Sequence, residues 1–472
     1  MRDVLSLSLG VALLLLGVAP ARAIDPQPNI ILIMADDLGW GELGCYGQKT
    51  IRTPHLDRMA AEGMRFTQFY SGSPVCAPAR CTLMTGKHGG HAYIRDNREI
   101  KPEGQVPLAA SETTIAKLLD NRGYQTGAIG KWGLGMPHDE GDPRKHGFDS
   151  FFGYYCQRHA HNHYPTYLWR NAERITLEGN PGKATGKQHT HDLFEAEAMR
   201  FLKENKDRPF FLYLPVTISH LALQIPDEEL APYAELPETE VTDKSGGYFP
   251  HPTPRAAYAA MVSRLDRTVG RIVDQVKELG MHERTLILFT SDNGPTYGRL
   301  GGADSAFFQS AGKLRGLKGS VYEGGMRVPL LARWPKYIRG GTTSDFVGYF
   351  PDLLPTLSEI AYGSPSDLPK GIDGISFATT LTGGGAIQKP HASLVWEFAG
   401  YGGQQAVRMG SWKGVRQGLV KSKGKSDWQL FDLKNDPNEE KDVAGDHPEV
   451  VAKIAKIMKE QHTESTLFPV PQ

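Results

Sequence analysis

The chain has 472 residues, which is enough for one large α/β domain and a smaller second one. Its 53 Lys and Arg residues balance its 53 Asp and Glu residues, so the composition gives no basic face of the kind that binds nucleic acid. Any anionic ligand must therefore be bound by a local cluster of charges.

The first residues have the pattern of a targeting segment. Arg2 precedes an apolar run over residues 4–18, and Ala21-Arg22-Ala23 resembles a signal-peptidase site. The run is short for a membrane span, and no other stretch is long enough to be one; an uncleaved anchor is the alternative. We expect residues 1–23 to be a signal peptide. The mature chain, from Ile24, would be exported to a periplasm or the medium without a membrane attachment.

Acidic and amide side chains follow two apolar runs. Residues 29–34 and 285–290 each predict a parallel strand that is buried on both faces. The side chains that follow are Asp36, Asp37, Asp292 and Asn293. Open α/β sheets bind ligands at the C-terminal ends of their strands, and hard oxygen ligands there indicate a divalent cation such as Ca²⁺. A solvated acidic loop and a simple turn are the alternatives.

Basic residues follow other predicted strands. Residues 123–131 end in Lys131, which has glycines nearby, and the strand at 209–216 is followed by His220. Lys318 lies in a glycine-rich stretch, where the backbone and the lysine can approach an anion closely. Each signal alone is weak, because Lys131 could lie in a turn and His220 on the surface.

Residues 73–86 place a cysteine ahead of a predicted helix. Pro78 suits the first helical turn, and Gly86 can end the helix in a left-handed conformation. Cys76 would lie just before the N-terminus, where unpaired N–H groups favour negative charge, and Arg80 would face the same way. This arrangement suits attack on a charged ester. A buried structural cysteine is the alternative.

The alternation of strands and helices predicts a doubly wound, mostly parallel α/β sheet. We expect Ser111 to cap one helix, residues 64–70 to form one strand and residues 371–381 to form a loop. Further helices are expected at residues 54–63, 191–205, 255–280 and 352–362. Short strands without intervening helices follow from about residue 388, and then a helix at 448–461. This predicts an α/β domain at 24–387 and a C-terminal subdomain with a small antiparallel sheet at 388–472.

These segments resemble the sulfatase family, the formylglycine-dependent type I sulfatases of the alkaline phosphatase superfamily. In that family the cysteine of a C-x-P/A-x-R element is oxidised to formylglycine. Cys76, Pro78 and Arg80 match this element, with Ala79 where most members have Ser. Three further matches are Leu83, Thr85 and Gly86. The resemblance covers nearly all of residues 29–469, with five segments in the family order.

The resemblance implies hydrolysis of sulfuric esters with formylglycine at position 76 and one calcium ion. Its implied metal ligands are Asp36, Asp37, Asp292, Asn293 and the modified Cys76. Its implied catalytic residues are Cys76, Arg80, Lys131, His220 and Lys318. The hydrated aldehyde would attack sulfur in line, the cations would offset charge, and His220 or Lys318 would protonate the leaving oxygen. A formylglycine-generating enzyme would act before export. Only Cys45, Cys81 and Cys156 would then remain as cysteines, so a disulfide framework is not expected.

One position departs from the family pattern. Sulfatases usually have a histidine two residues after the lysine, assigned to the formylglycine hydroxyl, and this chain has Gly133 there. That role is either absent or filled from elsewhere. The candidates are His138, His159, His161 and His163. The last three lie with Tyr164, Tyr167 and Trp169 in residues 157–170. This segment is either the wall of a sugar-binding pocket or a packed loop.

Two other functions fit the same residues. A formylglycine-dependent phosphodiesterase or phosphonate ester hydrolase would act on esters of similar shape and charge. A non-catalytic glycan-binding homologue is supported only by Gly133. Export, the loop of histidines and aromatic residues, and the lack of a basic groove favour a sulfated saccharide as substrate.

Overall fold

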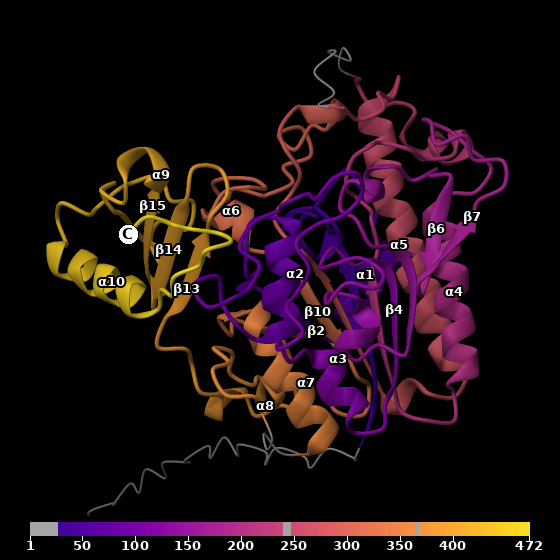
Figure 1. Cartoon of the computed structure of the whole chain (residues 1–472), viewed down its shortest axis with the longest axis horizontal. Coiled ribbons are helices and arrows are strands. Elements are labelled where there is room, and N and C mark those ends of the chain that lie inside the picture. The colour runs from indigo at the N-terminus through magenta and orange to yellow at the C-terminus, as the bar shows by residue number, and fades with distance from the viewer. Residues whose placement is uncertain (1–26, 239–246, 364–367) are drawn as a thin grey trace, which may run out of the picture.

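A computed structural model describes residues 27–238, 247–363 and 368–472. The expected signal peptide, residues 1–23, lies outside these ranges. Within them a ten-stranded sheet forms the centre of the molecule, and a four-stranded sheet lies to one side (Figure 1). In the described ranges, no helix combines the length and apolar character that a membrane span requires.

The centre of the large sheet is parallel. Its five parallel strands are, in spatial order, β9 (Thr285–Ser291), β1 (Asn29–Ala35), β8 (Phe210–Pro215), β4 (Gln125–Lys131) and β5 (Ser150–Tyr154). Beyond β9 lie β10 (Leu330–Arg333), β2 (Met64–Phe66) and β11 (Thr342–Ser344), and beyond β5 lie β6 (Tyr167–Arg170) and β7 (Glu173–Thr176). The strands β10 and β6 run antiparallel to their neighbours. The prediction of a mostly parallel sheet is confirmed.

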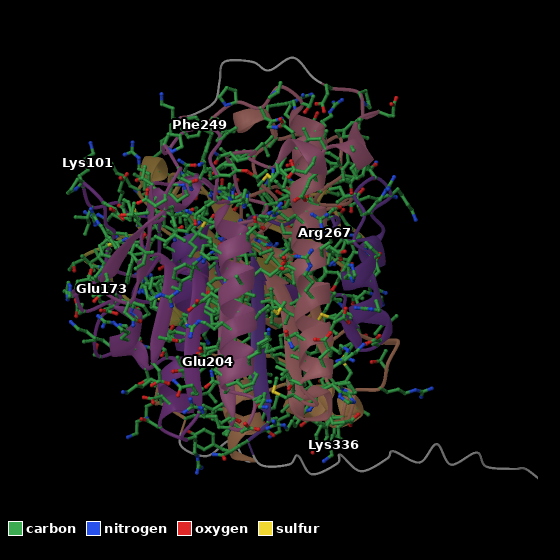
Figure 2. All side chains as sticks on the ribbon, turned by 90° about the vertical axis from the view of Figure 1, so that its right-hand side faces the viewer. Lys101, Glu173, Glu204, Phe249, Arg267 and Lys336 are labelled. Atoms are coloured by element: carbon green, nitrogen blue, oxygen red, sulfur yellow. The ribbon has the colours of Figure 1, made fainter. Side chains whose placement is uncertain are left out.

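The central strands are apolar throughout because their side chains alternate between two cores. Ile31 and Ile33 point into one core, and Ile30 and Leu32 point into the other. The first core is covered by α1 (Pro54–Ala61), α4 (Thr190–Glu204) and α5 (Pro254–Glu278). The second is covered by α2 (Cys76–Thr85), α3 (Ile115–Asp120), α7 (Leu353–Tyr362) and α8 (Ala378–Leu381). Figure 2 shows α4 and α5 side by side on the first face. Because helices cover both faces of the sheet, the fold is doubly wound as predicted.

Three local predictions are wrong. Residues 64–70 form two strands, because β3 (Phe69–Tyr70) leaves the large sheet and pairs with β12 (Gly348–Tyr349). Ser111 caps no helix. Instead α3 begins after Thr114, whose side chain accepts the Lys117 N–H at 3.1 Å. The expected loop at 371–381 contains the short helix α8.

The C-terminal region forms the antiparallel sheet that its sequence predicts. Its strands are β13 (Leu394–Phe398), β14 (Gln404–Met409), β15 (Trp412–Gln417), which was not predicted, and β16 (Gln429–Asp432). The helix α10 (Pro448–Glu460) covers one face, and the other face packs against the large domain. At this contact Trp396 lies 5.4 Å from Tyr70 between ring centroids, and its indole N–H donates to the Ser71 carbonyl at 2.8 Å.

A buried group of charges also joins the small sheet to the large domain. The Lys413 ammonium lies 2.9 Å from Glu323 in α6 (Glu323–Met326) and 3.0 Å from Glu439, and all three side chains are buried. Burial raises the pKa of Glu439 to about 7 despite the nearby lysine. Burial alone would also raise the pKa of Glu323, but Lys413 and Arg327 hold that pKa well below its usual range. The Lys413 ammonium therefore bridges two buried carboxylates, and Arg327 shares the neutralisation of Glu323.

We expect Lys413→Met to lower the free energy of unfolding by about 3–5 kcal/mol, because Glu439 then remains buried without its cation and Glu323 keeps only its pairing with Arg327. Urea unfolding followed by tryptophan fluorescence measures the loss. The matched control is Lys434→Met, at an exposed lysine, which should change stability by less than about 0.5 kcal/mol. Equal effects of the two substitutions would contradict a structural role for the buried ammonium.

Candidate active site

The loops after three central strands are bonded to one another by their backbones. The Asp36 N–H donates to the Ile218 carbonyl at 2.9 Å, and the Ser219 N–H returns a bond to the Asp36 carbonyl at 2.8 Å. The Asp292 N–H donates to the Ala35 carbonyl at 3.0 Å. The ends of β1, β8 and β9 are thus fixed together, and the predicted side chains converge at this edge.

Cys76 is the first residue of α2, not the residue ahead of it as expected, and Gly86 ends the helix in the left-handed region. The cysteine is 1% exposed, and its Sγ lies 3.5 Å from Asp36 Oδ1 and 3.5 Å from Lys318 Nζ. Burial and the charge of Asp36 raise the pKa of the Cys76 thiol to about 12. The unmodified side chain is therefore a thiol and a poor nucleophile. The four cysteines are unpaired in the structure.

Beneath Cys76, two carboxylates are paired with two buried cations. The Arg80 guanidinium lies 2.8 Å from Asp292 and 3.3 Å from Asp36, and the Lys131 ammonium lies 2.6 Å from Asp36. Burial would raise the pKa of Asp36, but the charges of Lys131 and Arg80 hold that pKa well below its usual range. Burial and the Asp36 charge raise the pKa of Asp292 to about 6.

Asp37 accepts bonds from several elements. Lys318 Nζ lies 2.8 Å from one carboxylate oxygen and 2.9 Å from the other, and Asn293 Nδ2 donates to Oδ1 at 2.8 Å. Nε2 of His220 lies 3.6 Å from Asp37. Nδ1 of His220 is 2.6 Å from the Leu221 carbonyl, so it carries the proton of the neutral ring and Nε2 is free to accept. Burial and Lys318 lower the pKa of His220, which favours this neutral form.

The oxygen atoms in this cluster fit a divalent cation. Asn293 Oδ1 is buried and has no hydrogen-bond partner among the described residues, while Nδ2 of the same amide is bonded. Asp36, Asp37 and Asp292 place carboxylates beside it. A set of carboxylate and amide oxygens is what Ca²⁺ prefers in proteins. Asp36, Asp37, Cys76 and His220 also each have a potential ligand atom within 4.8 Å of the others.

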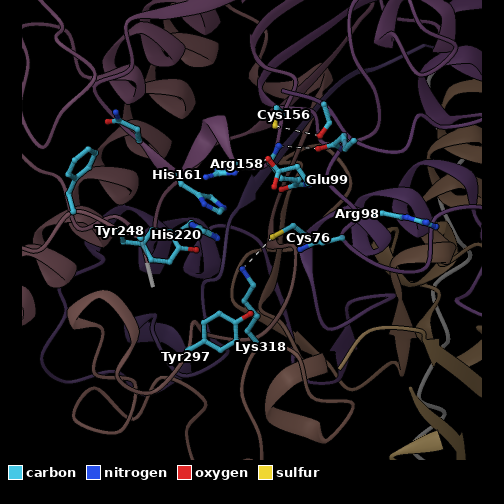
Figure 3. Close-up of a pocket in the computed structure, with 17 residues that line it drawn as sticks. Cys76, Arg98, Glu99, Cys156, Arg158, His161, His220, Tyr248, Tyr297 and Lys318 are labelled. Carbon is cyan, nitrogen blue, oxygen red and sulfur yellow. Dashed lines mark hydrogen bonds and ion pairs between the residues drawn. The ribbon is translucent and has the colours of Figure 1, made fainter. Parts of the chain in front are cut away.

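A pocket of about 560 Å³ opens above this cluster. Cys76, His220 and Lys318 line it, whereas Arg80 and Lys131 are buried behind it. Figure 3 shows Cys76 and Lys318 facing each other, with His161, His220 and Tyr248 to one side. Arg158 and Glu99 lie toward another side of the same pocket (Figure 3).

The histidine-rich loop contributes one ring to the pocket. His161 lines it and stacks on His220, with ring centroids 4.7 Å apart. His159 pairs with Glu103 at 3.4 Å, His163 is buried, and His138 is exposed. Tyr164, Tyr167 and Trp169 do not line the pocket. The loop is therefore a polar pocket wall rather than an aromatic one.

Sequence reasoning missed the aromatic side of the pocket. Tyr248, Phe249 and Tyr297 line it, and they come from loops without a helical or strand period. It also missed Gln105, and it did not single out Gln157 within the predicted segment 157–170, although both residues line the pocket. No local pattern marks these residues, since only the fold brings their loops together.

Comparison with known proteins identifies the family. Residues 28–364 match the family model described as Sulfatase, and residues 317–466 match the one described as N-sulphoglucosamine sulphohydrolase, C-terminal. The chain belongs to the sulfatase family. Human arylsulfatase A is 33% identical over 94% of this chain and 89% of its own length. Human N-acetylgalactosamine-6-sulfatase is 30% identical over 95% of this chain and 88% of its own length. This sulfatase is a sulfuric ester hydrolase.

Solved structures of other proteins share the fold of this chain. The structure of Ps i-CgsB in complex with k-i-k-neocarrahexaose is 28% identical, covers 92% of both chains and has a TM-score of 0.77. The phosphonate monoester hydrolase of Agrobacterium radiobacter is 21% identical, covers 94% of this chain and all of its own, and has a TM-score of 0.67. This second likeness shows a shared fold alone, so the sequence relatives decide the reaction class.

Glu42 supports the loop that carries the metal-ligand candidates. Its carboxylate accepts the Gly39 N–H at 2.6 Å and the Tyr258 hydroxyl at 2.6 Å, and Tyr258 in turn contacts Ser219 at 3.1 Å. Burial raises the pKa of Glu42 to about 7 from 4.5. The folded protein therefore binds this proton more tightly than the unfolded chain does.

A raised folded-state pKa gives stability that is complete below pH 4.5 and is lost as the pH rises through about 7. We expect Glu42→Gln, which mimics the protonated acid, to remove this dependence. Across that range the wild type should lose about 3 kcal/mol more unfolding free energy than the variant. Urea unfolding at a series of pH values measures both, with exposed Glu440→Gln as control. If the unfolding free energies of the wild type and Glu42→Gln change with pH in parallel, the raised pKa of Glu42 is refuted.

Proposed function

We propose that this sulfatase is an exported, calcium-dependent enzyme that hydrolyses a sulfate ester of a carbohydrate, with formylglycine made from Cys76 as its reactive group. The position of Cys76 carries the proposal. It lies at the start of a helix and lines the pocket, 3.5 Å from both a carboxylate and an ammonium. A thiol whose pKa is raised to about 12 serves poorly as a nucleophile, so the role of a precursor suits it better.

Conversion of Cys76 would precede folding. Its side chain is 1% exposed in the folded protein, so a formylglycine-generating enzyme could reach it only on an unfolded chain. Modification before export meets this requirement, and the sequence pattern of residues 1–23 supports export to a periplasm or the medium. Once formed, the hydrated aldehyde supplies the attacking oxygen, and its second hydroxyl allows the side chain to be regenerated.

The calcium site would use Asp36, Asp37, Asp292 and Asn293 together with the modified residue 76. The unpartnered Asn293 oxygen and the three adjacent carboxylates support this assignment. When bound, the cation would polarise the sulfate group and increase the acidity of an attacking hydroxyl.

The cations of the chain divide into two roles. Arg80 and Lys131 hold the carboxylates of Asp36 and Asp292 in place from behind the pocket. Lys318 reaches both Asp37 and Cys76, so its ammonium faces the place where a sulfate group would lie. Burial would lower the pKa of Lys318, but Asp37 raises it well above its usual value and keeps the side chain charged.

These protonation states support one of the two candidate proton donors over the other. Lys318 is a charged ammonium in the pocket, and it can donate to the leaving oxygen. His220 is a neutral ring whose Nε2 accepts, so it would orient a hydroxyl rather than protonate the leaving group. Lys318 is therefore preferred over His220 as the general acid.

The pocket supports a sugar as the alcohol. Tyr248, Phe249 and Tyr297 can stack on sugar faces, while Glu99 and Arg158 can bond hydroxyl groups. Relatives act on or bind saccharides by their names: one is an N-acetylgalactosamine-6-sulfatase, and one solved structure holds neocarrahexaose. We therefore propose a sulfated saccharide as the substrate class.

We expect Cys76→Ala and Cys76→Ser to abolish hydrolysis of nitrophenyl sulfate while leaving the melting temperature almost unchanged, because an enzyme that converts cysteine to the aldehyde acts on neither side chain. The matched control is Cys81→Ala on the same helix, which should stay active. All variants are co-expressed with a formylglycine-generating enzyme, and mass spectrometry of the wild-type peptide should show the aldehyde at position 76. Wild-type activity in either variant would contradict the mechanism.

If the wild type hydrolyses the matching nitrophenyl phosphodiester faster than nitrophenyl sulfate, the hypothesis of a phosphodiesterase or phosphonate ester hydrolase is favoured instead.

We expect a chelator to lower both activity and melting temperature, because three carboxylates then lose a shared cation, and added calcium to restore them. Asn293→Ala should raise the calcium concentration needed for half-restoration by about tenfold. Exposed Asn435→Ala is the control and should behave as the wild type. A protein that melts at the same temperature with and without chelator contradicts a calcium site.

A further inference from the structure

The space above Gly133 is already filled. A Cβ built on Gly133 would lie 2.2 Å from Gln157 Nε2, 3.1 Å from Gln157 Cδ and 3.4 Å from Arg80 Cδ. Gly133 also has φ +79°, a conformation that side chains rarely adopt. No residue larger than glycine fits here while Gln157 keeps its place. The side chain nearest to this space is therefore that of Gln157, and none of the candidate histidines is among the three nearest atoms.

The amide of Gln157 has no partner within the described residues. Its Oε1 and Nε2 are both buried, and neither makes a hydrogen bond there. Leaving such atoms unpaired in a buried place is unfavourable, so an amide held in this way needs an explanation. Gln157 lines the same pocket as Cys76 and His220, and this pocket is where a missing partner would be found.

The backbone holds Gln157 in this position. Its N–H donates to Oε1 of Gln105 at 3.0 Å, and the Gly133 N–H donates to the Tyr155 carbonyl at 3.1 Å. Gln105 is itself 4% exposed, and its Nε2 has no partner in the described ranges either. The segments that carry Gly133 and Gln157 are thus fixed side by side, and the glutamine side chain is placed by the fold rather than by its own contacts.

We propose that Gln157 is a positioning residue that takes the place of the absent histidine at Gly133 and hydrogen-bonds the oxygen atoms of residue 76 after its conversion. A carboxamide has a donor and an acceptor on one planar group, so Nε2 can donate to one oxygen while Oε1 accepts from a hydroxyl. Unlike imidazole, it orients these atoms without taking up a proton. The inference rests on the proposed formylglycine chemistry.

The first test separates the effect of the Gln157 hydrogen bonds from the effect of its side-chain size. Gln157→Met keeps a similar length and removes both polar atoms, and Gln157→His restores a donor and an acceptor. We expect Gln157→Met to lower kcat for nitrophenyl sulfate by about tenfold or more with KM changed less than about twofold, and Gln157→His to recover most of kcat. Gln275→Met, outside the pocket on α5, is the matched control. Gln157→Ala, which adds no contact, replaces Gln157→Met if that variant does not fold.

A second readout does not depend on turnover. An aminooxy reagent reacts with the aldehyde form of residue 76 and not with its hydrate. Because Gln157 would favour the hydrate, Gln157→Met should be labelled several-fold faster than the wild type, and Gln157→His at close to the wild-type rate. Mass spectrometry before labelling gives the fraction of residue 76 that is converted.

The outcomes distinguish this inference from the proposed function. A wild type with an unmodified Cys76 overturns both. A modified and active wild type, with Gln157→Met unchanged in kcat or in labelling rate, overturns the role of Gln157 alone. An equal loss of kcat in Gln157→Met and Gln157→His also overturns the role of Gln157, because it would indicate an effect on packing rather than on hydrogen bonding.

Discussion

The mutual neutralisation of buried charges at the C-terminal edge of the large sheet is the constraint on which the structure depends. Three buried carboxylates face three buried cations, and each pair joins different elements. The six side chains are Asp36, Asp37, Asp292, Arg80, Lys131 and Lys318. A buried charge without its partner is costly, so the strand ends, α2 and the Lys318 loop must all be in place together. The apolar strands supply the burial, and this charge cluster fixes how their ends are arranged.

The small C-terminal sheet is connected to this cluster. Trp396 donates its indole N–H to the Ser71 carbonyl, and the Ser71 hydroxyl donates to the Asp292 carbonyl. Tyr70, the residue before Ser71, donates its hydroxyl to Glu323, which pairs with Lys413 of the small sheet. The small sheet therefore supports the segment between β3 and Cys76, and through Ser71 it supports a metal-ligand candidate.

The sequence was sufficient where a signal is local. An apolar run followed at once by acids locates β1 and β9, and also places Asp36 and Asp292 at the sheet edge. Predictions failed where a distant partner decides the structure: Phe69 leaves its expected strand because it pairs with Gly348, far along the chain. The pocket walls were hidden for the same reason, since Tyr248 and Tyr297 belong to loops whose position only the fold determines.

At Gly133 the chain lacks the histidine of the sulfatase pattern, and the sequence alone explains only part of this difference. The sequence revealed that an imidazole is missing, but not that a carboxamide from another segment fills its space. The replacement changes the chemistry, because an imidazole can move a proton at neutral pH and an amide cannot. On the proposed mechanism, proton transfer near residue 76 then falls to Lys318, which Asp37 holds as a charged ammonium, while the neutral His220 orients a hydroxyl. The ion pair of Lys318 with Asp37, which helps to organise the fold, would thereby also determine which side chain gives a proton to the substrate.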